Sequence, residues 1–264
     1  MGILKCYVII FSMIYLWYFF ILAIGAVVGS FLNVVALRYG TGKSPLTGRS
    51  LCPVCGRKLS IVDLVPVLSF VFLRGKCGNC RAKISWQYPL VEILTAIVFL
   101  FLFRSPLALV AWCFLIIIMI YDWRHKIIPD GLALIFGVLT FLMAILNNLG
   151  GNLFPALLWG PLFAAPFFLL WYFSKGKWVG LGDAKLGLGL GWLLGGKSLD
   201  AFILAFWLGA AISLLIVGWQ HWQKNQGGLT MKSEVPFAPF LFAATFLVYF
   251  FHISPIKFIN FLFH

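Results

Sequence analysis

Eight apolar segments joined by polar loops restrict what this chain can fold into. They are residues 6–37, 89–103, 106–121, 131–146, 153–173, 184–194, 201–218 and 236–251. Apolar residues make up 62% of the chain, charged residues 10%, and the mean hydropathy is +1.03. A soluble domain needs a more polar surface than this composition provides. We therefore expect an all-α membrane protein whose helices cross a lipid bilayer about eight times.

The first segment is longer than the apolar part of a secretory signal. Lys5 precedes an apolar stretch that runs from Cys6 to Leu37, whereas the apolar part of a signal peptide spans about 7–15 residues. At about 1.5 Å per residue, a helix of this length crosses a hydrocarbon core of about 30 Å. We expect residues 1–37 to form a retained first transmembrane helix, with no cleaved leader.

Basic residues in the loops predict the orientation of the helices. Of the 20 Lys and Arg residues, 16 fall in one set of alternate loops and four in the other. Cytoplasmic loops carry an excess of such residues, so both termini are expected outside and the insert between the first two helices inside. The net charge of +13 then reflects these loops and not a nucleic-acid partner. Segment 184–194 is short and rich in glycine; if it crossed only half of the membrane, the orientation after it would be reversed.

The polar insert, residues 38–88, carries two Cys-x-x-Cys pairs. Cys52 and Cys55 are separated by 21 residues from Cys77 and Cys80, a spacing typical of zinc ribbons in which four thiolates bind one tetrahedral ion. Two disulfides are the alternative, but they require an oxidising compartment, and the basic residues place the insert in the cytoplasm. We predict a structural zinc site, which leaves no open position on the metal for catalysis.

Asp122 directly follows the third apolar segment, at the C-terminal end of the expected helix, where a carboxylate opposes the helix dipole. Its structural alternative is an interfacial salt bridge with Arg124 or Lys126. A functional role is favoured because the loop count places Asp122 at the cytoplasmic boundary, where an uncompensated acid is costly.

Asp183 lies at the same boundary, in Gly180-Leu181-Gly182-Asp183-Ala184-Lys185. Its structural alternative is an N-cap for a helix that begins at Ala184. Gly180 and Gly182 allow a tight or positive-φ backbone and leave room for a peptide substrate. If Asp122 and Asp183 meet, one proton shared between two carboxylates provides an acid and a base that together activate water.

The other polar residues near the membrane have simpler structural explanations. Asp130 is expected to cap the fourth segment and Asp200 the seventh, and Glu92 to lie in the first turn of the second. Asn33 is expected to form a hydrogen bond between helices, beside a close contact allowed by Gly25 and Gly29. Glu92, Asp130 and Asn33 remain secondary candidates for the functional site.

The order of these motifs resembles that of the bacterial type IV prepilin peptidases, which remove the leader from pilin-like precursors and methylate the new amino terminus. The resemblance is carried by Gly29-Ser30-Phe31-Leu32-Asn33-Val34, the cysteine pairs, Arg74-Gly75-Lys76-Cys77, Tyr88-Pro89-Leu90-Val91-Glu92, residues 122–130, residues 180–185 and Pro236-Phe237-Ala238-Pro239-Phe240. The Gly-x-Gly-Asp element is also similar to that of presenilin-like intramembrane aspartyl proteases.

The resemblance implies that Asp122 and Asp183 are the catalytic pair of a peptidase core spanning residues 89–264. It further implies prepilin or pseudopilin substrates, S-adenosylmethionine as methyl donor and a place in the bacterial cytoplasmic membrane. Gly180, Gly182 and Lys185 would support the substrate site. The cysteine module is the expected place for methylation, but no glycine-rich nucleotide motif identifies residues that bind the donor.

Two other classes of function fit parts of the sequence. A proton-coupled transporter could use the two aspartates as a relay, although transporter acids lie near mid-membrane and often in repeated halves. A non-enzymatic assembly factor could use the zinc module for docking. Such a factor would tolerate Asp→Asn changes at both positions, which an aspartyl peptidase would not.

Overall fold

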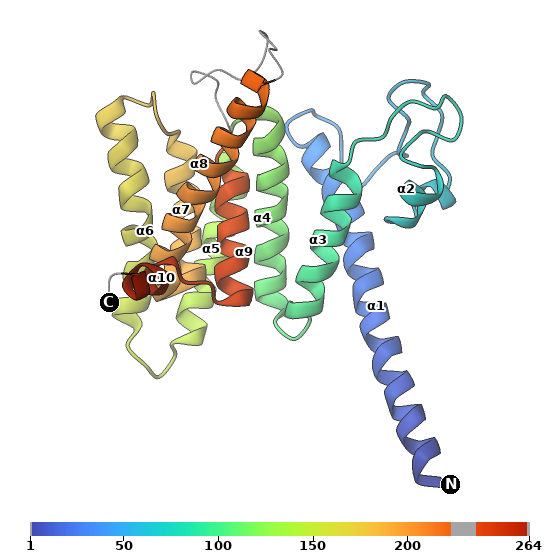
Figure 1. Ribbon diagram of the computed structural model, residues 1–264, viewed down its shortest axis with the longest axis horizontal. Helices are drawn as coiled ribbons and strands as arrows, with labels where there is room; N and C mark the ends of the chain where they lie inside the picture. Colours follow the sequence, from blue (N-terminus) through green and yellow to red (C-terminus); the bar gives the residue numbers. More distant parts are fainter. Residues whose placement is uncertain (1, 223–235, 263–264) are drawn as a thin grey trace. The chain divides into compact units, whose positions relative to one another are not determined.

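A computed structural model describes residues 2–222 and 236–262, and its regular structure is helical (Figure 1). The elements in chain order are α1 (Gly2–Arg38), η1 (Val62–Leu64), α2 (Leu68–Phe72), α3 (Gln87–Leu102), α4 (Pro106–His125), α5 (Asp130–Asn147), α6 (Leu153–Ser174), α7 (Leu181–Leu194), η2 (Gly195–Lys197), α8 (Ser198–Trp222), α9 (Ala238–Phe251) and α10 (Pro255–Leu262). The predicted all-α class is confirmed, and each of the eight apolar segments lies on a helix: α1 and α3 to α9.

Length and composition qualify five helical stretches as membrane spans. They are residues 12–38, 106–125, 130–147, 153–174 and 181–219, the last of which joins α7 and α8 through η2. The apolar helices α3 and α9 are shorter. The count of eight crossings therefore stays a prediction. Two of the bases behind the predicted orientation, Lys224 and Lys232, lie outside the described residues.

The chain forms two compact units that divide within α4. Residues 1–117 make up the first and residues 118–264 the second. The first unit contains α1, α3 and the polar insert, and the second contains α5 to α10 together with the C-terminal end of α4. Both predicted catalytic aspartates belong to the second unit, and all four cysteines of the insert belong to the first.

In the first unit, α1 packs along α3, and two glycines set how closely the helices approach. A Cβ atom on Gly25 would lie 2.7 Å from the Cα of Ala96, and one on Gly29 would lie 2.8 Å from the Cα of Glu92. Real Cβ atoms do not approach so closely, so the contact requires residues without side chains. The expected role of Gly25 and Gly29 in close helix packing is confirmed.

In the second unit, α7 packs against both α5 and α6, and α8 packs against α9. A Cβ atom on Gly191 of α7 would lie 2.7 Å from the Cα of Gly160 in α6. The indole of Trp192 fills the space beside Gly160 and donates a hydrogen bond from Nε1 to the Leu157 carbonyl, at 2.9 Å. The glycine-rich composition of α7 thus serves its packing between neighbouring helices.

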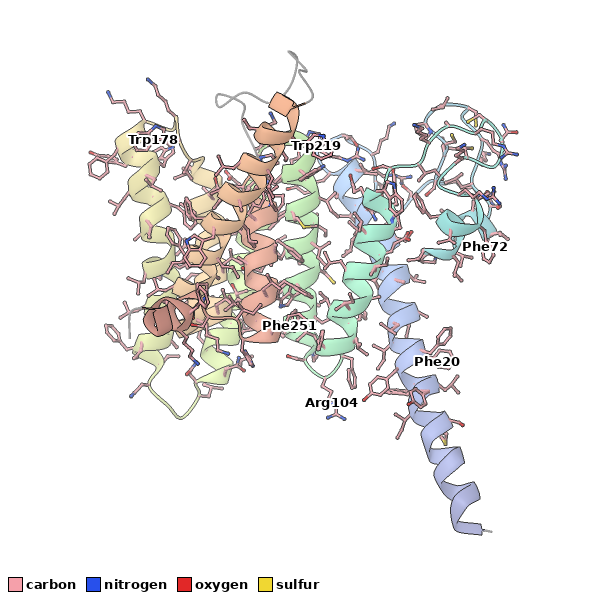
Figure 2. The ribbon with its side chains drawn as sticks, viewed as in Figure 1. Phe20, Phe72, Arg104, Trp178, Trp219 and Phe251 are labelled. Atoms are coloured by element: carbon pink, nitrogen blue, oxygen red, sulfur yellow. The ribbon has the colours of Figure 1, made fainter. Side chains whose placement is uncertain are left out.

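Large apolar side chains project outward from these helices. Phe20 on α1, Trp219 on α8 and Phe251 at the end of α9 are more than half exposed (Figure 2). On a soluble protein, extended apolar surfaces of this kind would be exposed to water, which is unfavourable. Next to lipid the same side chains are in a favourable solvent, in agreement with the membrane-spanning lengths of the helices.

Candidate active site

Asp122 lies in the last turn of α4, and its side chain is buried. The backbone N–H of Ala238, the first residue of α9, donates a hydrogen bond to Oδ2 of Asp122 at 3.1 Å. The start of a helix carries partial positive charge, so α9 offsets the unfavourable position of an acid at the end of α4. The turn Phe237-Ala238 therefore holds the Asp122 carboxylate in place.

Asp183 is the third residue of α7, which begins at Leu181 after the N-cap residue Gly180. The expected N-cap role of Asp183 is therefore wrong, because the helix starts three residues earlier than predicted. In the first turn the acid suits the helix dipole. Its carboxylate lies beside the backbone N–H of Gly180, an arrangement similar to the return bond of a capping box.

The carboxylates of Asp122 and Asp183 lie close enough for their charges to repel each other. Gly182 contributes to this arrangement, because a Cβ atom on it would lie 2.9 Å from the Cβ of Ile128. Ile128 belongs to the short loop between α4 and α5. The missing side chain of Gly182 thus allows the first turn of α7 to reach the loop that follows Asp122.

The two glycines before Asp183 differ in what they allow. Neither has positive φ, since Gly180 is extended at φ −76° and ψ 148° and Gly182 is helical. The positive-φ alternative is therefore wrong for both glycines, whereas a tight approach is present at Gly182. A Cβ atom on Gly180 would have ordinary contacts, the nearest being 3.6 Å from Oδ2 of Asp183, whereas Gly182 is constrained by packing against Ile128.

Asp130 and Lys185 form an ion pair between the first turns of α5 and α7, with 2.7 Å between Nζ and Oδ1. Asp130 is the first residue of α5, and Pro129 precedes it as the N-cap residue, so the expected capping role of Asp130 is wrong. The pair lies at one end of a groove between α5 and α7, of about 480 Å³, whose walls are otherwise mostly apolar.

Asn33 and Glu92 belong to the first unit. Asn33 is fully buried on α1; its Nδ2 donates to the Gly29 carbonyl at 3.3 Å, and its Oδ1 accepts from Nε2 of Gln87 at 3.2 Å. Glu92 lies in the second turn of α3, not in the first as expected, because α3 begins at Gln87. Its Oε2 accepts a hydrogen bond from the Val67 N–H at 2.7 Å.

The four cysteines of the insert converge. Their Sγ atoms all lie within 4.8 Å of one another, and those of Cys52 and Cys80 are 3.8 Å apart. A tetrahedral zinc ion with bonds of about 2.3 Å holds its sulfur ligands about 3.8 Å apart. The cysteines are thiols rather than disulfides in the structure, so this cluster has the donor set and spacing to hold a metal ion.

The two cysteine pairs are built alike. Antiparallel bridges join Leu51 to Lys58 around the first pair and Lys76 to Lys83 around the second. In the second pair, the backbone N–H groups of Cys80 and Asn79 lower the pKa of the Cys77 thiol to about 6. Backbone donors in these turns thus favour the thiolate form, which is the form that binds metal.

Two family models match consecutive parts of the chain. The bacterial peptidase A24 N-terminal domain matches residues 23–105, and the type IV leader peptidase family matches residues 109–217. A prepilin leader peptidase/N-methyltransferase of Bacillus subtilis is 33% identical over 249 residues, which cover 89% of this chain and 94% of the relative. The chain belongs to the type IV leader peptidase family.

Other members of this family are similar over parts of the chain. A prepilin leader peptidase/N-methyltransferase of Dichelobacter nodosus is 32% identical over 215 residues, covering 77% of this chain and 71% of the relative. A type 4 prepilin-like proteins leader peptide-processing enzyme of Escherichia coli is 37% identical over 133 residues, covering 40% and 49%. No solved structure matches the chain.

The boundary between the family models, at residues 105–109, lies close to the division between the compact units. The leader peptidase model covers Asp122 and Asp183 with their neighbours Ile128, Asp130 and Lys185. The A24 N-terminal model covers the cysteines, Asn33 and Glu92. Within this family member, the pair of aspartates and the cysteine cluster therefore belong to different modules.

Some of the contacts at these sites had no signal in the sequence. The Ala238 N–H, which bonds to Asp122, comes from a residue without a polar side chain. Asp200 was expected to cap α8 but is the third residue of that helix. Its Oδ1 accepts hydrogen bonds from the Ser254 hydroxyl at 2.7 Å and from the Ile256 N–H at 3.3 Å. Asp200 thus holds the start of α10, a helix that was not predicted.

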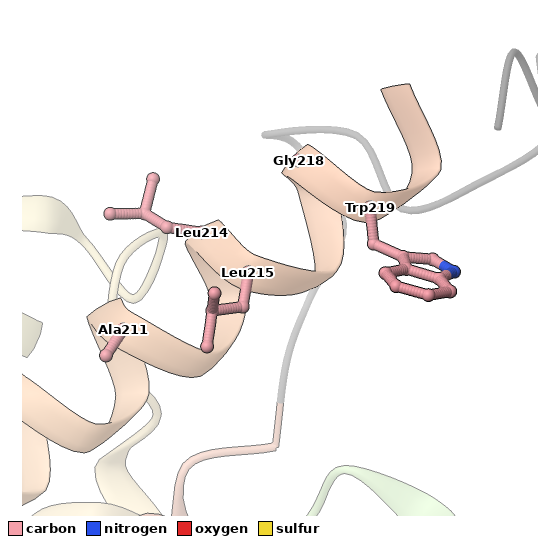
Figure 3. Close-up of a pocket in the computed structure, with 5 residues that line it drawn as sticks. All are labelled: Ala211, Leu214, Leu215, Gly218 and Trp219. Atoms are coloured by element: carbon pink, nitrogen blue, oxygen red, sulfur yellow. The ribbon is translucent and has the colours of Figure 1, made fainter. Parts of the chain in front are cut away.

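A second hollow, of about 550 Å³, lies along one face of α8 (Figure 3). Ala211, Leu214, Leu215, Gly218 and Trp219 line it. These residues carry no ionisable group, so this surface offers no acid, base or metal ligand. Its character suits contact with lipid.

Proposed function

We propose that this chain removes the leader from prepilins and pseudopilins by means of Asp122 and Asp183, and that it methylates the new amino terminus. The observation that carries the proposal is that the first turn of α7, which contains Asp183, packs through Gly182 on Ile128 in the loop after Asp122, within the part of the chain that matches the type IV leader peptidases. Its relatives from Bacillus subtilis and Dichelobacter nodosus bear the names of both activities.

Two neighbouring carboxyl groups that hold one proton between them can hydrolyse a peptide bond. The ionised carboxylate accepts a proton from water as the water oxygen attacks the scissile carbonyl carbon. The protonated partner donates its proton to the leaving amine as the C–N bond breaks. The Ala238 N–H and the first turn of α7 hold the two side chains in position for these transfers.

Methyl transfer is assigned to the first unit. S-adenosylmethionine would supply the methyl group. Zinc bound by Cys52, Cys55, Cys77 and Cys80 would have four sulfur ligands and no open coordination position. The metal would therefore stabilise the fold of the insert and take no part in either reaction.

The proposed location is the bacterial cytoplasmic membrane, with both termini outside and the cysteine module in the cytoplasm. The distribution of basic residues between alternate loops supports this orientation. It places the C-terminal end of α4 and the start of α7 at the cytoplasmic boundary. A substrate would then present its scissile bond at that surface.

The test is to incubate purified variants in detergent with a prepilin and S-adenosylmethionine and to determine the masses of the products. Asp122→Asn and Asp183→Asn should each abolish leader removal, because asparagine keeps the size of the side chain but neither accepts nor donates the required proton. Asp200→Asn is the matched control and should cleave normally. Cleavage by either active-site variant at the wild-type rate would refute the proposal and favour a scaffold.

A further inference from the structure

The polar insert contains a strained turn directly before α2. Val67 has φ 59° and ψ −50°, and the Leu68 N–H bonds to the Pro66 carbonyl across it. This is the rare form of γ-turn, with a positive φ at its centre. A β-branched residue is poorly suited to it, so the surrounding structure must hold Val67 in this conformation.

Glu92 provides that constraint. Its Oε2 accepts the Val67 N–H at 2.7 Å, and its side chain is only 7% exposed. The bond connects the insert to α3, while the backbone of Glu92 is also in contact with Gly29 of α1. Ser30 of α1 offers its hydroxyl to the same carboxylate. Glu92 therefore lies where α1, α3 and the insert meet.

Contacts continue from Val67 to the cysteine pairs. Val67 is the N-cap residue of α2, which carries Phe70. The Phe70 ring packs on Trp86 with 4.8 Å between the ring centres, and a Cβ atom on Gly75 would lie 3.1 Å from that ring. Gly75 comes two residues before Cys77. The backbone conformation of Val67 sets the direction of α2, and Phe70 of α2 packs beside the second cysteine pair. The turn at Val67 thus determines how this pair lies against the helices of the first unit.

We propose that Glu92 is a positioning residue that holds the cysteine module against α1 and α3 through the strained turn at Val67. We call this hydrogen-bonded contact between Glu92 and Val67 the joint, and we propose that methyl transfer depends on it. The inference rests on the proposed function, which assigns methyl transfer to the first unit. Leader cleavage uses aspartates of the second unit and should depend on the joint much less. The chemical requirement at position 92 is a hydrogen-bond acceptor and not a negative charge.

Three variants separate these requirements. Glu92→Gln keeps the shape and an acceptor oxygen, whereas Glu92→Met keeps a similar volume but has no acceptor for the Val67 N–H. The double variant Glu92→Met, Val67→Gly also lacks the acceptor, but it has at position 67 a residue that adopts positive φ without strain. Methylation and cleavage are measured on the same prepilin, and hydrogen exchange of the 62–73 segment reports the joint directly.

We expect Glu92→Met to lower methylation by about tenfold relative to cleavage, as expected when the buried Val67 N–H is left without an acceptor. Glu92→Gln should stay within about threefold of the wild type, and the added Val67→Gly should recover part of the loss. Exchange in the 62–73 segment should rise in Glu92→Met and not in Glu92→Gln.

Other results would overturn the inference. If Glu92→Gln loses methylation as fully as Glu92→Met while its exchange stays slow, the charge itself is needed and Glu92 is not a positioning residue. Equal loss of both activities in Glu92→Met, without recovery by Val67→Gly, would mean that the residue only supports folding. If Cys52→Ser loses methylation and Glu92→Met does not, the role of the joint is refuted, while the assignment of methyl transfer to the first unit stands. If Cys52→Ser methylates normally, the assignment of methyl transfer to the first unit is itself refuted.

Discussion

Gly182 lies against Ile128 so closely that a Cβ atom on the glycine would come within 2.9 Å of the isoleucine Cβ. This contact brings the start of α7 to the loop that follows Asp122. The spacing of the two aspartates therefore depends on a residue that has no chemistry of its own.

Gly182→Val should reduce leader cleavage by roughly tenfold or more, since a displacement of about 1 Å at a catalytic group can lower a rate by that much. Gly180→Ala is the matched comparison, because its Cβ would have no contact shorter than 3.6 Å. It should retain most of the activity. Equal losses of cleavage activity in the two variants would contradict a packing role specific to Gly182 and would indicate that both glycines leave room for the substrate.

Gly191→Ala tests the packing of α7 on α6. A Cβ atom at this position would clash with the backbone carbonyl of Trp159, which cannot move as a side chain can. We expect a loss of about 1–3 kcal/mol in the free energy of unfolding, as found for overpacked interiors. Thermal unfolding in detergent would measure it. Gly218→Ala is the control, because nothing lies within 4 Å of its added Cβ and its stability should not fall.

Asp122 has a structural role that can be separated from its proposed catalytic role. Asp122→Asn keeps an oxygen for the Ala238 N–H and should unfold at a temperature close to that of the wild type. Asp122→Leu leaves that buried N–H without an acceptor, which costs about 1–3 kcal/mol. Both variants should be inactive in cleavage. Equal stability of the two would show that the bond between Asp122 and Ala238 contributes nothing to the fold.

Metal content tests the cysteine cluster. Purified protein should contain one zinc per chain, and Cys52→Ser should lose it because one of four thiolate ligands is gone. Cys113→Ser, a change at a cysteine within α4, should retain the metal. Elemental analysis after dialysis measures both. Stoichiometric zinc in Cys52→Ser would contradict a four-sulfur site.

The ion pair between Lys185 and Asp130 should contribute little to stability. Both side chains are substantially exposed, and exposed pairs are worth about 0–1 kcal/mol. Asp130→Asn should therefore unfold within that range of the wild type. A loss of cleavage much larger than this change in stability would identify the pair as a substrate contact, whereas normal cleavage would leave it a surface interaction.

Hydropathy was sufficient to predict the helices, because each apolar segment is local in the sequence and long enough to be recognised. The cysteine cluster was predictable for the same reason, since the spacing within each pair already brings two thiolates together. The start of α7 was not, because Gly180 serves as N-cap residue and the helix begins at Leu181. Helix α10 was also missed, since it is short and follows the last apolar segment.

The contacts that orient the site could not be predicted from local patterns. Ala238 is 116 residues from Asp122, and Val67 is 25 residues from Glu92. In both bonds the donor is a backbone N–H, which every residue except proline has. Side-chain chemistry therefore indicated the candidate acids but not the contacts that hold them.

Helix α7, which carries Asp183, and helix α9, whose first N–H bonds to Asp122, have 14 residues each. At about 1.5 Å per residue each is about 21 Å long, less than a hydrocarbon core of about 30 Å. Short helices draw the polar surface of a bilayer inward. Hydrolysis consumes water, and a locally thinned membrane beside these helices would keep the carboxylates close to the polar surface from which that water comes.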